Sequence, residues 1–562
     1  MLMKIVGAVG QITGSCTWCI HEETGTQFLV DCGMVQGEHQ NFEMHQKFDF
    51  DPCLIKFVLL THAHLDHCGM LPVLRARGFC GKIYCTKATE DLTKLQLQDC
   101  YAHMDRNDLR DILGANYFDS LSEKTGDGSH SHGKNEFRKF TELLVDDLQF
   151  SSFDDKFLQK RLFPISEDVF IAPLGSSHVL GATAFQISWS LPDGSNKSIC
   201  FSGDVGSANE DEHCHLSLLR ANQTAHPGTN YFVCESTYGD RVRESDHKDF
   251  HNRIECLLRI MSEPNYGTVI IPCFSMQRVQ DVLVDLFYCF QKEPSKQRVT
   301  VYVDSPMAKN FCKIYREELR KTDVSKKGNP YLVYLVKGFH ERFGSGENLT
   351  KAQQVEMCEK TLSQILSPGK WPSGVDFDIG RVPETGGEKG KKVIITSSGM
   401  CQAGRVLEHL SRLNSEKTAL ILTGFQATPN GRNLKKLASG EKGHFHLTVS
   451  KTSGNHETTV LSSDEIKGKV FDLSPHYSGH ADKEGLLDFL FSIPGMERRG
   501  KPKSTVTVFL NHGLNSGRRA LRDAILQRSK EDIPTDWRTV NRVEIPHKNS
   551  PFFDLDKDEW VS

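Results

Sequence analysis

Short apolar runs bounded by turn residues recur through the first third of the chain. Such runs predict β-strands, and the longer ones predict buried strands. The runs are residues 27–30, 55–60, 82–85, 169–172, 184–189 and 198–201. Between them, residues 120–136 are polar and rich in glycine, serine and histidine, which predicts a mobile loop. We therefore expect a sheet-rich N-terminal region.

From about residue 231 the pattern changes to alternating strands and helices. Apolar runs again predict the strands, at residues 231–234, 268–271, 299–303, 392–396 and 419–422. The second of these runs precedes apolar residues spaced i, i+3, i+4, i+7 and i+8, which predicts a helix with one buried face. The helix residues are Val279, Val282, Leu283, Leu286 and Phe287. Strands that alternate with helices predict a parallel α/β sheet.

After about residue 434 the β-rich pattern returns, with apolar runs at residues 506–510 and 543–545. The strand–helix region is therefore predicted to be an insertion. We expect a first domain in two parts, residues 1–210 and 435–562, and an inserted domain at residues 211–434. A length of 562 residues also favours two hydrophobic cores over one.

Composition narrows the class of protein. Lys and Arg total 68 against 72 Asp and Glu, so the net charge of −4 gives no overall signature of nucleic-acid binding. Any polyanion must be held by a local site. The 17 cysteines are scattered and odd in number, which favours a reducing compartment over a disulfide scaffold. No apolar run is long enough to span a bilayer and the N-terminus is unlike a secretory signal, so we expect a cytoplasmic protein without membrane contact.

The densest chemistry lies in residues 61–67 (THAHLDH), directly after a predicted strand. His62, His64, Asp66 and His67 are four metal-capable side chains within six residues. Burying them unpaired would cost free energy, which argues against a packing role. At the exit of a strand, alternate residues His62 and His64 can face one metal, and Asp66 and His67 a second. Imidazole and carboxylate ligands suit zinc, with manganese or iron as alternatives.

Three further candidates follow predicted strands. His178 lies in residues 174–181 (LGSSHVLG), and Asp204 lies in residues 201–206 (FSGDVG), where glycine allows the backbone to approach a metal closely. Beside the first motif they are expected to complete the ligand set, with Asp204 bridging two metals. Asp31 is predicted either to accept a hydrogen bond from a ligand histidine or to be a turn residue.

This arrangement resembles the metallo-β-lactamase superfamily, whose mark is an H-x-H-x-D-H sequence with a later His and Asp. Further segments resemble motifs of its β-CASP branch, the nucleic-acid nucleases. They are residues 234–239 (CESTYG), 304–308 (DSPMA), 397–400 (SSGM), 478–482 (SGHAD) and 510–513 (LNHG). The resemblance covers nearly the whole chain, with its motifs in the expected order. Departures are a polar stretch around residues 126–133 and extra residues between 329 and 389.

The resemblance implies a fold and a substrate class. The fold would be an α/β metallo-β-lactamase αββα sandwich carrying an inserted β-CASP domain with a parallel sheet. Members of the branch that process DNA tend to have Val at the position of His512, whereas members that process RNA have His there, as a ligand of the second metal. His512 therefore favours RNA as the substrate.

The resemblance also implies how the site would work. Two Zn²⁺ ions per chain, or Mn²⁺ as the alternative, would activate a water for in-line attack on a phosphodiester. The catalytic residues would be Asp66, Glu235 and His480, with His480 as the general acid supported by Glu235. Because the attacking oxygen comes from water, we expect 5′-phosphate and 3′-hydroxyl products.

Loops of the inserted domain are expected to hold the RNA backbone through hydroxyl, amide and guanidinium donors. The candidates are Arg278, Ser305, Ser398, Gly399, Arg405, Arg432 and Ser478. The favoured function is therefore that of an RNA-processing endoribonuclease similar to the cleavage and polyadenylation endonucleases. The partners considered are a second copy of the chain, as a homodimer, and an RNA-processing partner. The alternatives are a DNA nuclease of the same branch, a non-catalytic scaffold subunit and a small-molecule hydrolase of the wider superfamily.

Overall fold

The computed structural model divides the chain into two compact units. One contains Met1–Ala208, Leu219–Val242 and Gly479–Ser562, and the other contains Asn209–Leu218 and Arg243–Ser478. The residues that the structure describes are 1–36, 47–125, 134–153, 163–166, 168–206, 229–295, 297–320, 349–383, 390–441, 443–450, 458–491, 505–530 and 539–561. Among these residues, no helix is both long and apolar enough to cross a membrane.

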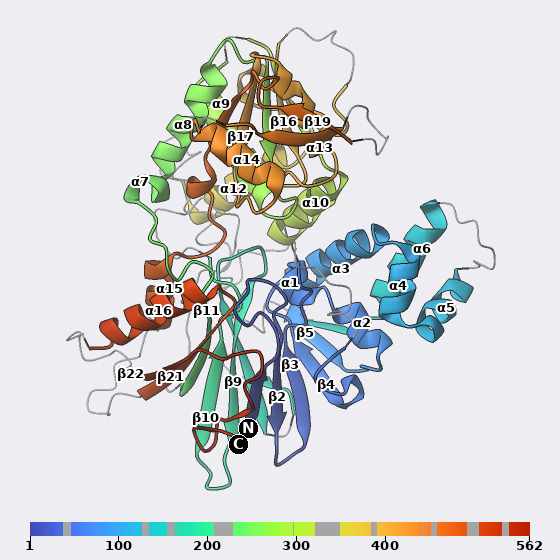
Figure 1. Ribbon diagram of the computed structural model, residues 1–562, viewed down its shortest axis with the longest axis vertical. Coiled ribbons are helices and arrows are strands. Elements are labelled where there is room, and N and C mark those ends of the chain that lie inside the picture. Colours follow the sequence, from blue (N-terminus) through green and yellow to red (C-terminus); the bar gives the residue numbers. More distant parts are fainter. Residues whose placement is uncertain are drawn as a thin grey trace. The chain divides into compact units, whose positions relative to one another are not determined.

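The first unit is built on two sheets, as far as the described residues go (Figure 1). In order of pairing, one sheet contains β24 (Glu559–Trp560), β23 (Phe553–Asp554), β1 (Leu2–Ile5), β2 (Thr17–His21), β3 (Thr26–Val30), β4 (Ile55–Leu59), β5 (Lys82–Thr86) and β6 (Phe150–Phe153). The other contains β22 (Thr539–Glu544), β21 (Thr505–Asn511), β11 (Tyr231–Glu235), β10 (Asn196–Phe201), β9 (Thr183–Ser190), β8 (Val169–Gly175) and β7 (Phe163–Pro164).

Helices cover the outer face of each sheet, which gives the expected αββα layers. Figure 1 shows α15 (Lys483–Phe491) and α16 (Asn515–Arg528) beside the second sheet. The helices beside the first sheet are α2 (Leu71–Ala76), α3 (Lys87–Ala102), α4 (Arg106–Leu113), α5 (Ala115–Lys124) and α6 (Lys134–Asp146).

Alternation along the strands explains these layers. In β4, Phe57 and Leu59 join the core between the two sheets, whereas Val58 joins the core under the helices. In β11, Val233 faces the core between the sheets and Phe232 faces α15 and α16. Because successive side chains point to opposite faces, a strand buried on both faces is apolar throughout. This is why the continuous apolar runs of the sequence predicted buried strands correctly.

Parallel strands gather the functional loops at one edge of the second sheet. β10 pairs in parallel with β11, and β11 with β21, in a register that sets Glu235 opposite Asn511. β8 runs in the same direction as β10, because each is antiparallel to β9 between them. The carboxyl ends of β8, β10, β11 and β21 therefore lie along one edge, the usual place for ligands in α/β sheets.

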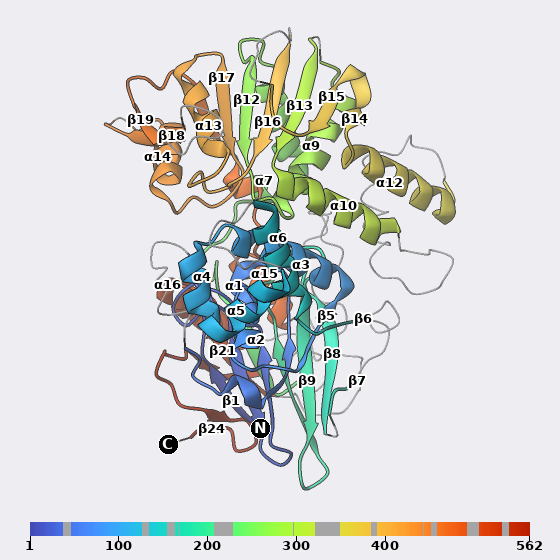
Figure 2. The ribbon, with the colours of Figure 1, turned by 90° about the vertical axis from the view of Figure 1, so that its right-hand side faces the viewer.

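The second unit contains a largely parallel sheet (Figure 2). Its strands, in order of pairing, are β14 (Gly369–Lys370), β15 (Asp376–Ile379), β13 (Val299–Asp304), β16 (Lys391–Thr396), β12 (Thr268–Pro272), β17 (Thr418–Leu422) and β20 (Lys469–Asp472). The antiparallel pair β18 (His446–Ser450) and β19 (Thr458–Ser462) forms a separate hairpin. The helices are α7 (Ser245–Lys248), α8 (Phe250–Ser262), α9 (Arg278–Lys292), α10 (Pro306–Arg320), α12 (Lys351–Ile365), α13 (Val406–Leu410) and α14 (Pro429–Ala438).

The structure differs from the sequence-based expectation in three places. The strand at residues 231–234, expected in the inserted domain, is β11 and belongs to the first unit, because it pairs with β10 and β21 of that unit's sheet. The inserted unit continues past residue 434 to Ser478, because β20 pairs in parallel with β17 and so extends the second unit's sheet. The expected loop at residues 120–136 overlaps α5 and α6, whose apolar residues, such as Phe118 and Phe140, are buried in the core. Residues 126–133 lie outside the described residues, as do 329–348 and 384–389 of the expected extra residues between 329 and 389.

Candidate metal centre

The candidate ligands come together from segments far apart in the sequence, all in the first unit. They follow strands β4, β8, β10 and β21, with a short helix, α1 (Leu65–Cys68), after β4. Their side chains form two overlapping groups in which the ligand atoms lie within 4.8 Å of one another. The first group is His62, His64, His178 and Asp204, and the second is Asp66, His67, Asp204 and His512.

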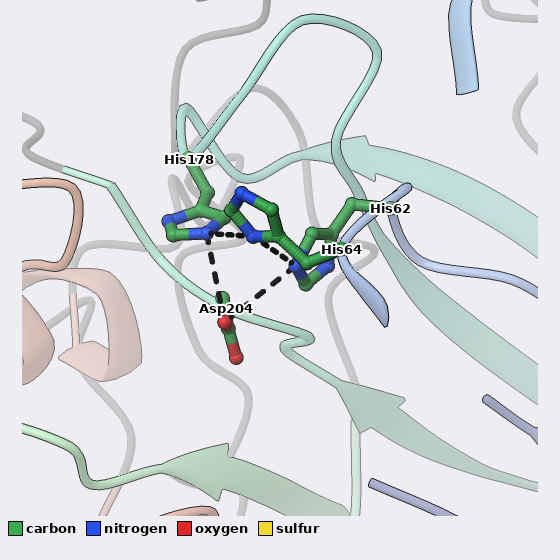
Figure 3. Close-up of side chains that lie close together, drawn as sticks. All are labelled: His62, His64, His178 and Asp204. Atoms are coloured by element: carbon green, nitrogen blue, oxygen red, sulfur yellow. Dashed lines mark hydrogen bonds and ion pairs between the residues drawn. The ribbon is translucent and has the colours of Figure 1, made fainter. Parts of the chain in front are cut away.

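In the first group, three imidazole nitrogens and one carboxylate oxygen converge (Figure 3). His64 Nδ1 lies 3.1 Å from His62 Nε2 and 3.0 Å from His178 Nε2. Asp204 Oδ2 lies 3.6 Å from both Nε2 atoms. The four atoms therefore surround one point from four directions.

Hydrogen bonds on the far side of two rings orient them. His178 Nδ1 donates to the Gly479 carbonyl at 2.7 Å, which leaves Nε2 with its lone pair toward the group. The Thr61 hydroxyl donates to Asp31 at 2.9 Å and so accepts from His62 Nδ1 at 3.1 Å. Both Nε2 atoms are thereby acceptors or ligands, not donors.

Burial keeps these rings neutral. It lowers the pKa of His62 and of His178 well below the usual value, and the pKa of His64 to about 4. Neutral imidazoles with converging lone pairs repel one another unless a cation or a proton lies between them. The group is therefore suited to a cation.

The second group is held at similar spacing. His67 Nε2 lies 3.3 Å from His512 Nε2 and 3.2 Å from Asp204 Oδ1. His512 Nε2 lies 3.4 Å from Asp66 Oδ2. Within the part of the chain that the structure describes, Asp204 Oδ1 is buried and has no hydrogen-bond partner. An unsatisfied buried carboxylate oxygen is costly, and a bound cation would remove that cost.

Charges within the second group favour a cation as well. Burial alone would lower the pKa of His67, but the carboxylates of Asp204 and Asp31 raise it well above the usual value. Burial would raise the pKa of Asp66, but a hydrogen bond with His512 and the charge of His67 lower it to about 2. The group thus holds net negative charge that attracts protons, and a metal ion can take their place.

Outer hydrogen bonds also fix the second group. Asp31 Oδ2 accepts from His67 Nδ1 at 2.7 Å, which confirms the prediction that Asp31 orients one of these histidines. Thr237 Oγ1 lies 3.2 Å from His512 Nδ1. Sequence reasoning missed Thr237, and its only signal was its place in the segment 234–239.

The donor sets fit zinc. Zinc–nitrogen and zinc–oxygen bonds of 2.0–2.2 Å in a tetrahedron place neighbouring ligand atoms about 3.3–3.6 Å apart. The separations given above run from 3.0 Å, between His64 and His178, to 3.6 Å, between Asp204 and the first two Nε2 atoms. Each set mixes imidazole and carboxylate donors, and Asp204 offers one oxygen to each.

Beside the two groups lies a histidine–carboxylate pair. His480 Nδ1 is 3.1 Å and 3.2 Å from the two carboxylate oxygens of Glu235. Glu235 also accepts hydrogen bonds from the backbone N–H groups of Val205, at 2.6 Å, and Thr237, at 3.2 Å. Burial lowers the pKa of His480, but the charges of Glu235 and Asp204 outweigh it and raise this pKa to about 9. His480 Nε2 is 4.0 Å from Asp204 Oδ2.

The expected RNA-contact residues all belong to the second unit. Ser305, Ser398 and Gly399 follow strands β13 and β16, whose carboxyl ends share one edge of the parallel sheet. Arg278 is buried and donates to the carbonyls of Thr423 and Tyr477, which is a structural role.

Two further arginines of this set are engaged with neighbours. Arg405 pairs with Asp304, and its side chain keeps 34 % exposure. Arg432 is exposed and donates to the Ala427 carbonyl. Ser478, the last residue of the second unit, is nearly buried at 9 % exposure.

An αββα sandwich with these donor sets at one sheet edge defines a metallo-β-lactamase fold. Family models agree with this assignment. The model of the metallo-beta-lactamase superfamily matches residues 13–148, and that of the Beta-Casp domain matches residues 279–434. The chain belongs to the metallo-β-lactamase superfamily and carries its β-CASP domain.

Curated relatives match most of the chain. Ribonuclease TTHA0252 of Thermus thermophilus is 27 % identical over 501 residues, which cover 88 % of this chain and 91 % of the relative. Transcription termination factor FttA of Methanocaldococcus jannaschii is 24 % identical, covering 92 % of this chain and 67 % of the relative. Endoribonuclease ysh1 of Emericella nidulans is 23 % identical, and the match covers 94 % of this chain and 52 % of the relative. These relatives place the chain among the hydrolases of the superfamily.

Proposed function

We propose that the protein is a metal-dependent ribonuclease that cleaves RNA internally and leaves 5′-phosphate and 3′-hydroxyl ends. The observation that carries this proposal is the pair of donor sets that share Asp204, with His480 and Glu235 beside them. Relatives named as a ribonuclease and an endoribonuclease support RNA as the substrate. His512 in the second donor set supports it further.

Two zinc ions are the cofactors that fit best. His62, His64, His178 and Asp204 would hold one, and Asp66, His67, Asp204 and His512 the other. When bound, such ions supply a nucleophile from water at neutral pH and stabilise charge on phosphate oxygens. Asp204 would fix the separation of the two sites, because each of its oxygens faces one set.

The protein's own acid would be His480. Glu235 accepts a hydrogen bond from His480 Nδ1, and this bond orients His480 Nε2 toward the donor sets. A proton on Nε2 can then pass to the alcohol oxygen that leaves the phosphate. Backbone N–H groups of Val205 and Thr237 hold the Glu235 carboxylate in place, so the orientation of His480 depends on a fixed partner.

The test compares cleavage of circular and linear RNA and of matched single-stranded DNA, with and without a chelator. An endonuclease opens the circular RNA, whereas an exonuclease cannot start on it. The product ends are read by 5′ labelling with a kinase before and after phosphatase treatment. We expect chelator-sensitive opening of the circle, with ends that label only after phosphatase.

Three results would contradict the proposal. Cleavage that survives the chelator would exclude a metal-dependent reaction. Products that label directly would carry 5′-hydroxyl ends. Equal rates on RNA and DNA would favour the DNA nuclease.

A further inference from the structure

Two exposed phenylalanines stand at the carboxyl edge of the parallel sheet in the second unit. Phe274 follows β12 and Phe425 follows β17, and these strands are neighbours. Their exposed fractions are 38 % and 39 %. Every other aromatic residue that the structure describes is buried or only partly exposed. Exposed aromatic rings lose hydrophobic stabilisation, so two of them at a ligand-binding edge suggest a partner.

The two rings belong to one surface. A Cβ built on Gly424 would lie 3.1 Å from Phe274 Cε2, and Gly424 directly precedes Phe425. A Cβ on Gly399 would lie 2.7 Å from the Phe274 nitrogen and 3.1 Å from its Cδ2. The Phe274 ring thus lies against two backbone segments that lack side chains, and any larger residue there would displace it. The Phe274 ring therefore lies directly against the segment that carries Phe425, and the two exposed side chains form one aromatic surface.

One cationic side chain and two hydroxyl groups lie close to this aromatic surface along the same segments or the neighbouring strand. Arg432, in the first turn of α14, donates to the carbonyl of Ala427, two residues after Phe425. At the end of β13, the hydroxyls of Ser305 and Ser275 lie 3.1 Å apart. Ser275 directly follows Phe274. Aromatic rings with an adjacent guanidinium are the means by which proteins bind single-stranded nucleic acid without reading its sequence.

A protein partner fits this edge less well. Interfaces of stable complexes need a contiguous apolar patch of several hundred Å². Here the two rings are set among glycine, serine and arginine, a composition that suits a base and its phosphate better.

We propose that Phe274 and Phe425 form a base-stacking platform for single-stranded RNA, with Arg432 pairing with a phosphate next to the stacked bases. This inference rests on the proposed function, which makes RNA the substrate. Stacking accepts every base, because each has a π face. The platform therefore contributes affinity and holds the strand without selecting a sequence.

The first experiment measures RNA affinity by fluorescence anisotropy. All proteins carry His480→Ala so that bound RNA stays intact. Phe274→Leu and Phe425→Leu keep an apolar side chain but remove the π face. We expect each to weaken binding of a single-stranded RNA by roughly 5- to 100-fold, as for the loss of one stacked base. Val460→Ala is the control, since Val460 is 57 % exposed on β19 of the same unit.

The second experiment identifies the stacked bases. Single abasic positions are placed along the RNA and each affinity is measured. With both phenylalanines present, one or two positions should weaken binding by the same factor as the leucine substitutions. With both phenylalanines replaced by leucine, an abasic site at those positions should not weaken binding further, because the stacking contact that it removes has already been lost.

Each result bears on one proposal. Unchanged affinity in both leucine variants, or equal abasic losses with and without the phenylalanines, would overturn the platform. If the unmodified protein, which retains His480, binds RNA but does not cleave it, the proposed function is wrong. The effect of the abasic positions on binding still shows whether the two phenylalanines stack on bases. Circular dichroism of each variant checks that the fold is retained.

Discussion

At the scale of single residues, Asp204 has the most demanding position in the centre. Each of its carboxylate oxygens faces a different donor set, and the side chain is 2 % exposed. Its backbone follows Gly203, which has φ of +55° and lies against Thr61, where a Cβ would be 2.8 Å from the threonine Cβ. A residue other than glycine would be strained there and would displace Asp204 from both sets.

Asp66 tests the number of cations. It belongs to the second set only, so Asp66→Ala should reduce bound zinc from two per chain to one. The first set keeps all its donors in this variant. Elemental analysis of protein purified without a metal-binding tag gives the stoichiometry. One zinc in both proteins would exclude the two-metal centre.

His480 tests the assignment of the acid. It belongs to neither four-residue set, so His480→Ala should keep both cations and lower RNA cleavage by roughly 10²–10⁴-fold. A nitrophenyl phosphodiester has a leaving group that needs no proton, and its cleavage should fall much less. His247→Ala is the control, because His247 is partly exposed in the second unit. Equal losses on both substrates would instead assign His480 to positioning the phosphate.

At the scale of elements, glycine controls how the loop after β3 meets α1. A Cβ on Gly33 would lie 1.7 Å from the carbonyl oxygen of Asp66. Gly33→Ala should therefore displace the start of α1, destabilise the fold by about 1–3 kcal/mol or more and lower occupancy of the second cation. Gly267→Ala is the control, since nothing lies within 4 Å of its Cβ position. Urea unfolding and elemental analysis measure both effects, and equal behaviour of the two variants would refute the prediction.

A buried cluster fixes the end of the second unit. Tyr477 donates to Asp285 at 2.7 Å, and the guanidiniums of Arg253 and Arg278 lie 5.0 Å and 5.2 Å from the centroid of its ring. Arg253 also pairs with Asp285 at 2.9 Å. The cluster holds the chain in place just before it returns to the first unit.

Two matched tyrosines measure what burial contributes to such a bond. Tyr117 donates to Asp147 at the same 2.7 Å, but the Asp147 side chain is 29 % exposed, whereas that of Asp285 is 1 % exposed. Tyr477→Phe leaves a buried carboxylate with one donor fewer and should cost about 1–3 kcal/mol. Tyr117→Phe should cost less, because water replaces the lost donor. Calorimetry measures the free energy of unfolding of both variants. A larger decrease for Tyr117→Phe than for Tyr477→Phe would contradict this prediction.

The sequence predicted elements best where burial is on both faces. The apolar runs at 231–234 and 506–510 form β11 and β21, because a strand that is buried on both faces can contain few polar residues. Short edge strands such as β14 and β24, and helices with polar faces such as α3, gave no comparable signal. The H-x-H-x-D-H segment and later His and Asp indicated the ligands. Hydrogen bonds from Thr237 or the Gly479 carbonyl depend on tertiary contacts that no local pattern encodes.

At the scale of the whole molecule, the cation donors all belong to one unit. Each unit has its own core, so the two can unfold in separate transitions. Removing the cations with a chelator should lower the unfolding temperature of the first unit only. A ligand at 100–1,000 times its Kd stabilises the native state by about 2.7–4.1 kcal/mol.

Calorimetry before and after chelation, and after zinc is restored, measures this effect. The Tyr477→Phe variant, which weakens the second unit, assigns the transitions, because it should lower only the unfolding temperature of that unit. A chelator that shifts both transitions equally, or neither, would show that the cations do not stabilise the first unit selectively.

The pairing of β21 beside β11 also affects when the centre can form during synthesis. His62, His64, His178 and Asp204 are in place once the first 204 residues exist, but His512 is translated some 300 residues later. A nascent chain therefore carries one complete donor set and an incomplete second one until β21 has been made. If the proposed two-cation centre cleaves RNA, the order of translation would delay its completion until the inserted unit has been synthesised, so that a half-made chain would not expose the ribosome's own RNA to a finished active site.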